Sequence, residues 1–316
     1  MPLLKLVPDD TNIDFMRWRK IALVLSLALS IASLVLVGVR GLNFGIDFVG
    51  GQVVRTEFAK PVDIEQLRGQ VAALELGDAS IQEFGDSRTY QIRLPRPEGS
   101  DEAAAAAVTK LRQGIVQAYP DARVDAGESV SGKVSGELAR DGAIAIALAM
   151  LGIAIYIWFR FEWQFGVGAL LTLAHDVSVV LGFFALTQLQ FDLNVVAAFL
   201  AIVGYSLNDT VVIYDRIREN LRKFRKMQII PLLNLSLNET LSRTVVTSLS
   251  IMLALAALLF LGPDIIFGLT AGILLGTFIG TYSSIYISAS MLVLLGVEPD
   301  SFLKPEEGPA ATPNEA

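Results

Sequence analysis

Six long apolar runs constrain this chain more than any other feature. A helix that crosses about 30 Å of hydrocarbon needs roughly 20 mostly apolar residues. The six runs of that kind are approximately 21–39, 141–159, 165–187, 193–213, 244–261 and 266–295. Of the 316 residues, 53% are hydrophobic and only 18% are charged, which is unusual for a soluble protein. The sequence therefore predicts an α-helical polytopic membrane protein with six transmembrane helices.

The first run resembles a signal peptide, because Arg17, Arg19 and Lys20 precede it. Its apolar core is too long for one, however, and no small-x-small cleavage site follows it. We interpret it as an uncleaved anchor.

The distribution of Lys and Arg predicts that both termini are cytoplasmic. The N-terminal segment 1–20 and the connection 214–243 are basic, whereas the connections 188–192 and 262–264 contain no Lys or Arg. Positive charge marks the cytoplasmic side, and it also attracts anionic lipid. We therefore expect a cytoplasmic basic loop at 214–243 and an extracytoplasmic segment at 40–140. The tail 296–316 is rich in Pro, Glu and Ala, and we expect it to be cytoplasmic and disordered.

The segment 42–136 differs in character from the apolar runs. Alternating apolar residues predict strands, and apolar residues at helical spacing predict helices. The expected elements, in order, are strand 52–58, helix 61–76, strands 81–84 and 89–94, helix 101–119 and a weaker strand 122–130. The order βαββαβ is typical of a small ferredoxin-like α+β domain. Its carboxylates fit solvated faces, so we expect a binding surface or a moving part, joined to the second span by a flexible connector at 129–136.

Asp209 is the residue within the runs that most needs an explanation. A carboxylate within a membrane span costs at least about 2.5 kcal/mol, and such groups usually face a bundle interior and belong to ion pathways. Tyr205, Asn208 and Val212 share its face by helical spacing. Counted from Arg216, Asp209 lies about 10 Å inside the cytoplasmic border.

Arg243 begins the fifth run at a similar depth. A pair between Asp209 and Arg243 would lower the cost of both charges and hold the carboxylate ionised. The alternative is that Arg243 only marks the interface as a positive-inside residue.

Two further groups lie within the runs. In the third run, His175 and Asp176 share a face with Thr172, and they indicate either a proton path or a structural hydrogen bond that holds helices together. In the sixth run, Gly272, Gly276 and Gly280 are spaced for close helix packing. A second stripe there bears hydroxyl groups that would hydrate a path or bond to neighbouring helices: Thr277, Thr281, Ser284 and Ser288.

Composition argues against several classes of site. The chain has no cysteine and one histidine, which argues against a thiolate or histidine metal site. Its net charge of −7 gives no indication of nucleic-acid binding. We expect no cofactor and no enzymatic activity.

Several strings resemble the SecD/SecF family of bacterial export proteins, within the resistance-nodulation-division superfamily. They are Asn43-Phe44-Gly45-Ile46-Asp47-Phe48-Val49-Gly50-Gly51, Tyr156–Trp163, Ala174-His175-Asp176-Val177 and Gly204–Thr210 followed by Asp215–Asn220. The length and the short external domain resemble the SecF members rather than SecD or the fused form. The resemblance covers nearly the whole chain.

The resemblance implies a subunit of the bacterial inner membrane that uses the proton-motive force to help pull preproteins out on the far side. The partners so implied are SecD as a heterodimer, the SecYEG channel, YajC and YidC, with an unfolded preprotein as substrate in a lipid bilayer. Asp209 would carry the proton, with Arg243 beside it. Gain and loss of that proton would repack the helices.

Three rival functions remain open. An efflux half-transporter would need a larger external domain with a substrate cleft. A passive scaffold subunit would only dock partners, and its buried charges would be dispensable. An intramembrane aspartyl protease would use Asp176 and Asp209, but these lie at different depths in the predicted spans.

Overall fold

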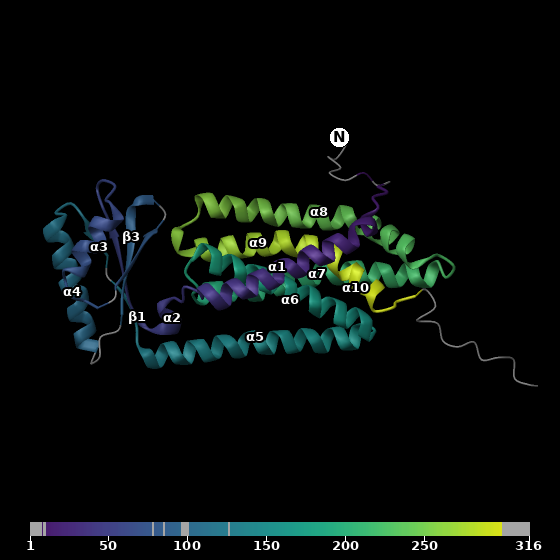
Figure 1. Cartoon of the computed structure of the whole chain (residues 1–316), viewed down its shortest axis with the longest axis horizontal. Helices are drawn as coiled ribbons and strands as arrows, with labels where there is room; N and C mark the ends of the chain where they lie inside the picture. Colours follow the sequence, from purple (N-terminus) through teal and green to yellow (C-terminus); the bar gives the residue numbers. More distant parts are fainter. Residues whose placement is uncertain are drawn as a thin grey trace, which may run out of the picture.

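The computed structural model describes residues 8, 11–77, 79–84, 86–95, 101–125 and 127–298. It consists of a long helical bundle with a small sheet domain at one end (Figure 1). The beginning of α1 (Arg19–Arg40) and the end of α10 (Ala289–Leu294) lie at the other end of the bundle. Most of the tail 296–316 falls outside the described residues, and so does the expectation that it is disordered.

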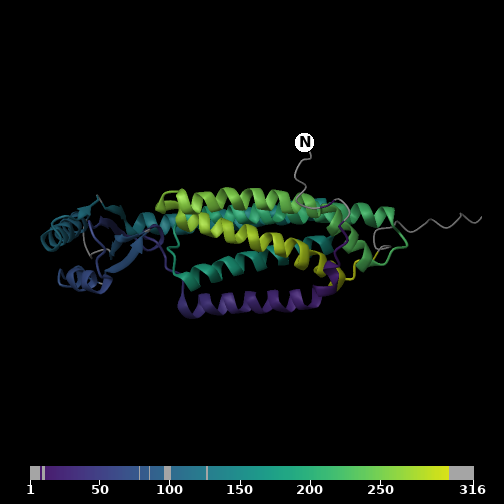
Figure 2. The same cartoon turned by 90° about the horizontal axis from the view of Figure 1, so that it is seen from above.

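The prediction of six spans is confirmed. The described residues contain six helices that are long and apolar enough to cross a membrane. They are Phe15–Arg40 (the 3-10 turn η1, Phe15–Trp18, and α1), α5 (Gly132–Arg160), α6 (Trp163–Thr187), α7 (Leu193–Lys223), α8 (Ile229–Leu261), and Phe267–Leu294, which combines α9 (Phe267–Ser283), η3 (Ser284–Ser288) and α10. A 3-10 turn, η2 (Asp264–Ile266), precedes α9. In Figure 2, α1 (purple) and α8 (green) lie on opposite faces of the bundle, with α9 (yellow) between them.

The expected basic loop 214–243 is wrong, because this segment is mostly helical. Helix α7 continues to Lys223 and α8 begins at Ile229, so only residues 224–228 connect them. The continuations are amphipathic: Ile217 and Leu237 are buried in one core cluster, while Arg216 pairs with Glu239 at 2.7 Å on the polar side. Charge patterning alone had suggested a loop, but the apolar stripe extends both helices past the membrane-spanning part.

The sheet domain has the predicted βαββαβ order. Its elements are β1 (Gly51–Glu57), α3 (Ile64–Ala72), β2 (Ser80–Phe84), β3 (Asp86–Leu94), α4 (Asp101–Ala118), β4 (Arg123–Val124) and β5 (Glu128–Val130). The strand order is β2-β3-β1-β4, with β5 also paired to β1, and all pairs are antiparallel. The expected last strand is therefore split in two. Strand and helix residues such as Val54, Leu67, Ile92 and Leu111 form a core separate from that of the bundle.

The expected flexible connector 129–136 is also wrong. Residues 128–130 form β5, and α5 begins at Gly132 immediately after it. The Ser131 side chain caps this helix by accepting a hydrogen bond from the Val134 N–H group at 3.4 Å. Because serine is a favoured N-cap, the Ser and Gly content that had suggested flexibility marks a helix start instead.

The glycines of α9 allow close contact with its neighbours. A Cβ atom placed on Gly276 would lie 2.5 Å from the Ile202 side chain, and one on Gly280 would lie 3.2 Å from Ser206, while Gly272 faces the ring of Phe184. Close approach of this kind is what small residues permit between membrane helices. A similar contact that was not predicted involves Gly182 of α6, where a Cβ atom would lie 2.4 Å from Ser33 of α1.

We predict that Gly276→Ala destabilises the isolated chain in detergent by about 1–3 kcal/mol, because the added methyl group collides with Ile202. Gly204→Ala is the matched control, since nothing lies within 4 Å of its added Cβ and alanine favours the helix. Thermal unfolding would compare the two. Equal midpoints would contradict this account of the α7–α9 contact.

Candidate functional site

Asp209 lies on α7 with only 3% of its surface exposed. Its carboxylate oxygen Oδ2 accepts a hydrogen bond from the Ser248 hydroxyl of α8 at 3.5 Å. Among the described residues, this long contact is the only hydrogen bond of the carboxylate. An ionised carboxylate removed from water needs close donors or a cation in exchange. The ionised form of Asp209 is therefore poorly compensated within this chain.

Ser248 connects Asp209 to two other hydroxyl groups. Its Oγ atom accepts a hydrogen bond from the Tyr205 hydroxyl of α7 at 2.9 Å and lies 2.8 Å from the Thr281 hydroxyl of α9. A hydroxyl has two lone pairs and one proton. The Thr281 hydroxyl also lies 2.8 Å from the Thr277 carbonyl, so its one proton has two acceptors within reach. When it donates to Ser248, both lone pairs of Ser248 are occupied and the Ser248 proton is available for Asp209. The network thus joins α7, α8 and α9 around the carboxylate.

Arg243 does not form the expected direct pair with Asp209. Arg243 is exposed on α8, whereas the next residue, Thr244, is buried toward the bundle. Successive helical residues are turned by about 100°, which directs Arg243 away from the face that carries Thr244 and Ser248. Arg243 still lies within electrostatic range of the Asp209 carboxylate.

Asn208 is likewise not part of this network. It lies on the exposed side of α7, on a strip that also includes Ala201 and Gly204. An amide and small residues along an apolar helix are typical of helix–helix contacts in membranes. The structure therefore separates Asn208 from the face that buries Asp209.

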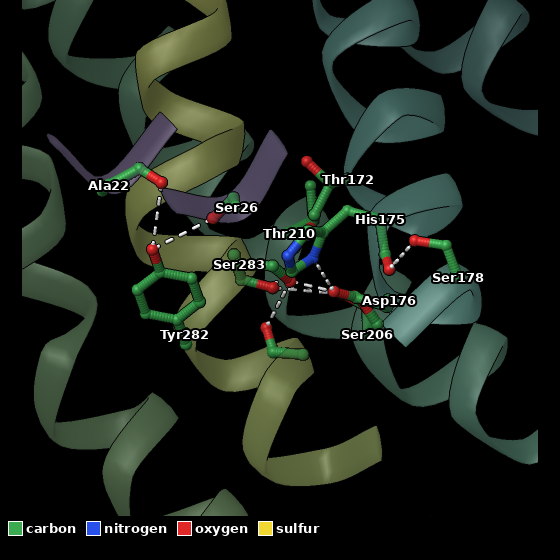
Figure 3. Close-up of polar contacts among 12 residues, drawn as sticks. Ala22, Ser26, Thr172, His175, Asp176, Ser178, Ser206, Thr210, Tyr282 and Ser283 are labelled. Atoms are coloured by element: carbon green, nitrogen blue, oxygen red, sulfur yellow. Dashed lines mark hydrogen bonds and ion pairs between the residues drawn. The ribbon is translucent and has the colours of Figure 1, made fainter. Parts of the chain in front are cut away.

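Asp176 occupies a second polar cluster, on α6, and is fully buried. Its Oδ2 atom accepts hydrogen bonds from Ser206 of α7 at 2.5 Å and from Ser283 of α9 at 2.9 Å. Its Oδ1 atom lies 2.9 Å from Nδ1 of His175. Figure 3 shows these contacts converging from three helices. Asp176 is thus well compensated by hydrogen-bond donors, in contrast to Asp209.

His175 is bonded through only one of its ring nitrogens. Its Nε2 atom is buried without a hydrogen-bond partner, and the whole residue is 6% exposed. The nearby Tyr282 ring lies at a centroid distance of 6.4 Å, and its hydroxyl is 3.0 Å from that of Ser26 on α1 (Figure 3). The contacts of Asp176 fit the alternative in which the His175–Asp176 pair holds helices together, since they link α6, α7 and α9.

A π-helical turn, η3, interrupts the sixth span at the level of these clusters. The Ser284 hydroxyl at its start lies 3.0 Å from that of Thr210 on α7. Single π turns are frequent at functional sites. No residue pattern indicates this turn, because the hydroxyl stripe at steps of four, three and four residues fits a regular helix.

The carboxylates of Asp176 on α6 and Asp209 on α7 lie at nearby levels of the bundle but do not bond to each other. Ser206, which bonds to Asp176, precedes Asp209 by about one turn of α7. No hydrogen bond between the Asp176 and Asp209 side chains is found among the described residues. They do not form the shared-proton pair that an aspartyl protease requires.

The motif residues after α1 lie where the sheet domain meets the bundle. The side chains of Asn43 and Asp47 bond to Gln188 and Leu193, at the end of α6 and the beginning of α7. Gly45 also packs closely against the loop between α6 and α7, because a Cβ atom there would lie 2.8 Å from the Gln190 side chain. Gly50 and Gly51 have φ angles of 72° and 117° and lead into β1. These positive φ values favour glycine at both positions.

We predict that Asp176→Ala lowers the unfolding temperature of the chain in detergent by several degrees. The substitution leaves the Ser206 hydroxyl and the His175 ring nitrogen without their partner, at about 1–3 kcal/mol for each buried group, while Ser283 keeps its bond to the Gly280 carbonyl. Ser250→Ala removes an exposed hydroxyl bonded to its own helix and is the control. An Asp176→Ala protein as stable as this control would show that the cluster does not hold the helices.

Two family models match the chain. One, described as the C-terminal part of the protein export membrane proteins SecD and SecF, matches residues 110–298. The other, described as the SecD/SecF GG motif, matches residues 35–62, which include Gly50 and Gly51 at the beginning of β1.

Curated relatives of similar length are described as protein translocase subunits. A protein translocase subunit SecF from Cereibacter sphaeroides is 43% identical over 301 residues, covering 93% of each chain. One from Pseudomonas aeruginosa is 41% identical over 295 residues, covering 93% of this chain and 95% of the relative.

Solved structures agree. The crystal structure of SecDF from Thermus thermophilus, described as a translocon-associated membrane protein, matches with a TM-score of 0.84 and 36% identity. A super-membrane-facing form of SecDF matches with a TM-score of 0.67 and 34% identity. Each match covers 90% of this chain but only 39% of the SecDF chain. The chain belongs to the SecD/SecF family of protein export membrane proteins, and within that family to the SecF members.

Proposed function

We propose that the chain acts with a SecD subunit to promote the late stage of preprotein export, and that Asp209 binds and releases the proton that drives it. The observation that carries this proposal is the burial of Asp209, 3% exposed, with one hydrogen bond of 3.5 Å. A carboxylate so poorly compensated at membrane depth is a functional group by default. Asp176, with three donors, is the structural counterpart.

Protonation of Asp209 changes what its neighbour must do. The ionised carboxylate accepts the Ser248 proton, whereas a protonated carboxyl group has a proton of its own to donate. Ser248 would then turn and give up one of the bonds from Tyr205 and Thr281. Because those residues lie on α7 and α9, a single proton changes contacts among three helices.

The energy available is adequate for such a change. A proton that crosses about 150 mV releases roughly 3.5 kcal/mol. At about 1.4 kcal/mol per factor of ten, this biases a two-state equilibrium a few hundredfold. One proton would drive one swing of a small domain.

The exposed face of α7 supports docking of a SecD-type subunit. Asn208 lies there at membrane depth, and Arg243 lies exposed on the adjacent α8. Polar and charged side chains are costly against lipid, so a second membrane protein that covers them would recover that cost. Movement of Arg243 toward Asp209 on docking would supply the cation that the carboxylate lacks.

The family resemblance supports the wider assignment. On this basis we propose that the chain lies in the bacterial inner membrane beside SecYEG, YajC and YidC, with an unfolded preprotein as the substrate. The basic residues of α7 and the connection after it, including Arg222 and Arg225, support a cytoplasmic position for that end and for both termini. The sheet domain then lies on the far side, where the preprotein emerges.

We predict that Asp209→Asn abolishes the stimulation of export by the proton-motive force but leaves assembly with SecD intact, because shape is kept and a buried charge is removed. Preprotein export into inverted membrane vesicles, with and without an ionophore, measures this. Glu219→Gln, an exposed acid on the same helix, is the control.

Either rival function would give a different result. Export that remains fully stimulated in Asp209→Asn, and in the double variant with Arg243→Gln, would favour the passive scaffold. Normal export with loss of resistance to small hydrophobic compounds would favour an efflux pump.

A further inference from the structure

The segment that leads from α1 into the sheet domain is fastened to the loop between α6 and α7. The Gly45 N–H group donates to the Phe191 carbonyl at 2.8 Å, and the Phe191 N–H group donates to the Asn43 carbonyl at 2.8 Å. A Cβ atom on Gly45 would lie 2.8 Å from the Gln190 side chain and 3.2 Å from that of Asp192. This close approach therefore requires a residue without a side chain at position 45.

Asp47 extends this attachment to α7 itself. It lies in the short helix α2 (Ile46–Val49), and its Oδ2 atom accepts a hydrogen bond from the Leu193 N–H group at 3.0 Å. Leu193 is the first residue of α7, and N–H groups in a first helical turn have no acceptor within their own helix. A carboxylate there is also favoured by the positive end of the helix dipole.

The same segment is held by the sheet on its other side. It continues through Gly50 into β1, which begins at Gly51. Arg93 of β3 donates to the Phe44 carbonyl at 2.7 Å and to Asn43 Oδ1 at 3.2 Å. Burial lowers the pKa of this guanidinium, so it depends on these acceptors for compensation. Residues 43–47 thus lie between the sheet and the beginning of α7 and bond to both.

We propose that Asp47 couples movement of α7 to the sheet domain. Its carboxylate accepts a hydrogen bond from the first N–H group of α7, and the segment that contains Asp47 continues directly into β1. The proposal rests on the proposed function, in which α7 carries the proton site. Asp209 lies about 24 Å along the same helix at about 1.5 Å per residue, and a rigid helix transmits a shift over that length. Asp47 is a positioning residue that binds neither the proton nor the preprotein.

The test separates coupling from proton binding. In vesicles that contain the chain with its SecD partner and the translocase, Asp47→Ala is expected to retain proton uptake, followed by a pH-sensitive dye. Export of a radiolabelled preprotein per proton taken up is expected to fall about fivefold, the factor that corresponds to about 1 kcal/mol for a lost helix cap. Asp209→Asn, in contrast, is expected to lose both signals.

Two variants control for simple destabilisation. Asp192 caps the same helix end by accepting from the Val195 N–H group at 3.0 Å, but it belongs to the loop before α7. Asp192→Ala therefore weakens α7 at the same place without cutting the link to the sheet, and it is expected to keep the normal ratio of export to proton uptake. Asp47→Asn retains a neutral acceptor for Leu193 and is expected to restore most of the coupling.

A distance measurement provides a second readout. Because the chain has no cysteine, spin labels at Lys110→Cys on α4 and Leu253→Cys on α8, both exposed positions, report on the sheet domain relative to the bundle. Their separation is expected to change with the proton gradient in the otherwise unaltered chain and in Asp192→Ala, but not in Asp47→Ala. An unchanged ratio and unchanged movement in Asp47→Ala would overturn the proposal, as would joint loss of proton uptake and export.

Discussion

The structure depends on the inability of lipid to hydrogen-bond. Hydroxyls and carboxylates within the spans must bond to partners inside the protein, because an unpartnered polar group there destabilises the fold. They gather accordingly between α6, α7, α8 and α9, while α1 and α5 present mainly apolar, exposed faces. Within that interior the two acids are treated differently. Asp176 has three close donors, and Asp209 has one distant donor. On this difference rests our proposal that Asp176 holds the helices together and that Asp209 changes their packing.

The chain spans 39% of the SecDF chain that it matches. In the proposed assembly with a SecD subunit, that subunit covers the exposed Asn208 and Arg243. The compensation that Asp209 lacks is therefore expected from the assembled complex. The sheet domain, in contrast, has its own core and a complete set of antiparallel strand pairs among its described residues. It is attached to the bundle at residues 43–47 and at the β5–α5 connection.

Much of this architecture could be predicted from the sequence. Apolar run length gave the six spans, and alternation of period two gave the sheet domain, because both signals are repeated over many residues. The extent of α7 and α8 could not be predicted from charge counts, since the basic residues are the polar face of helices whose apolar face is buried. The seeming connector at Ser131 was a helix cap.

The site was predictable in identity but not in geometry. Asp209 and Asp176 could be identified because each is an acid within an apolar run, and the cost of burying an acid there follows from its residue type alone. Which face Arg243 occupies depends on the rotation of α8 about its axis, which its packing against the neighbouring helices sets. The pairing of Asp176 with Ser206 and Ser283 requires knowledge of which helices are neighbours, and the π turn η3 has no composition signal.

Infrared difference spectroscopy of the assembled complex tests the central claim most directly. A protonated carboxyl group has a C=O stretch that an ionised carboxylate lacks. We predict a C=O band that appears when the complex is acidified, disappears when the pH is raised again, and is absent from Asp209→Asn. Spectra of the two proteins that are identical at every pH would show that Asp209 never takes up a proton, and the account of coupling would fail.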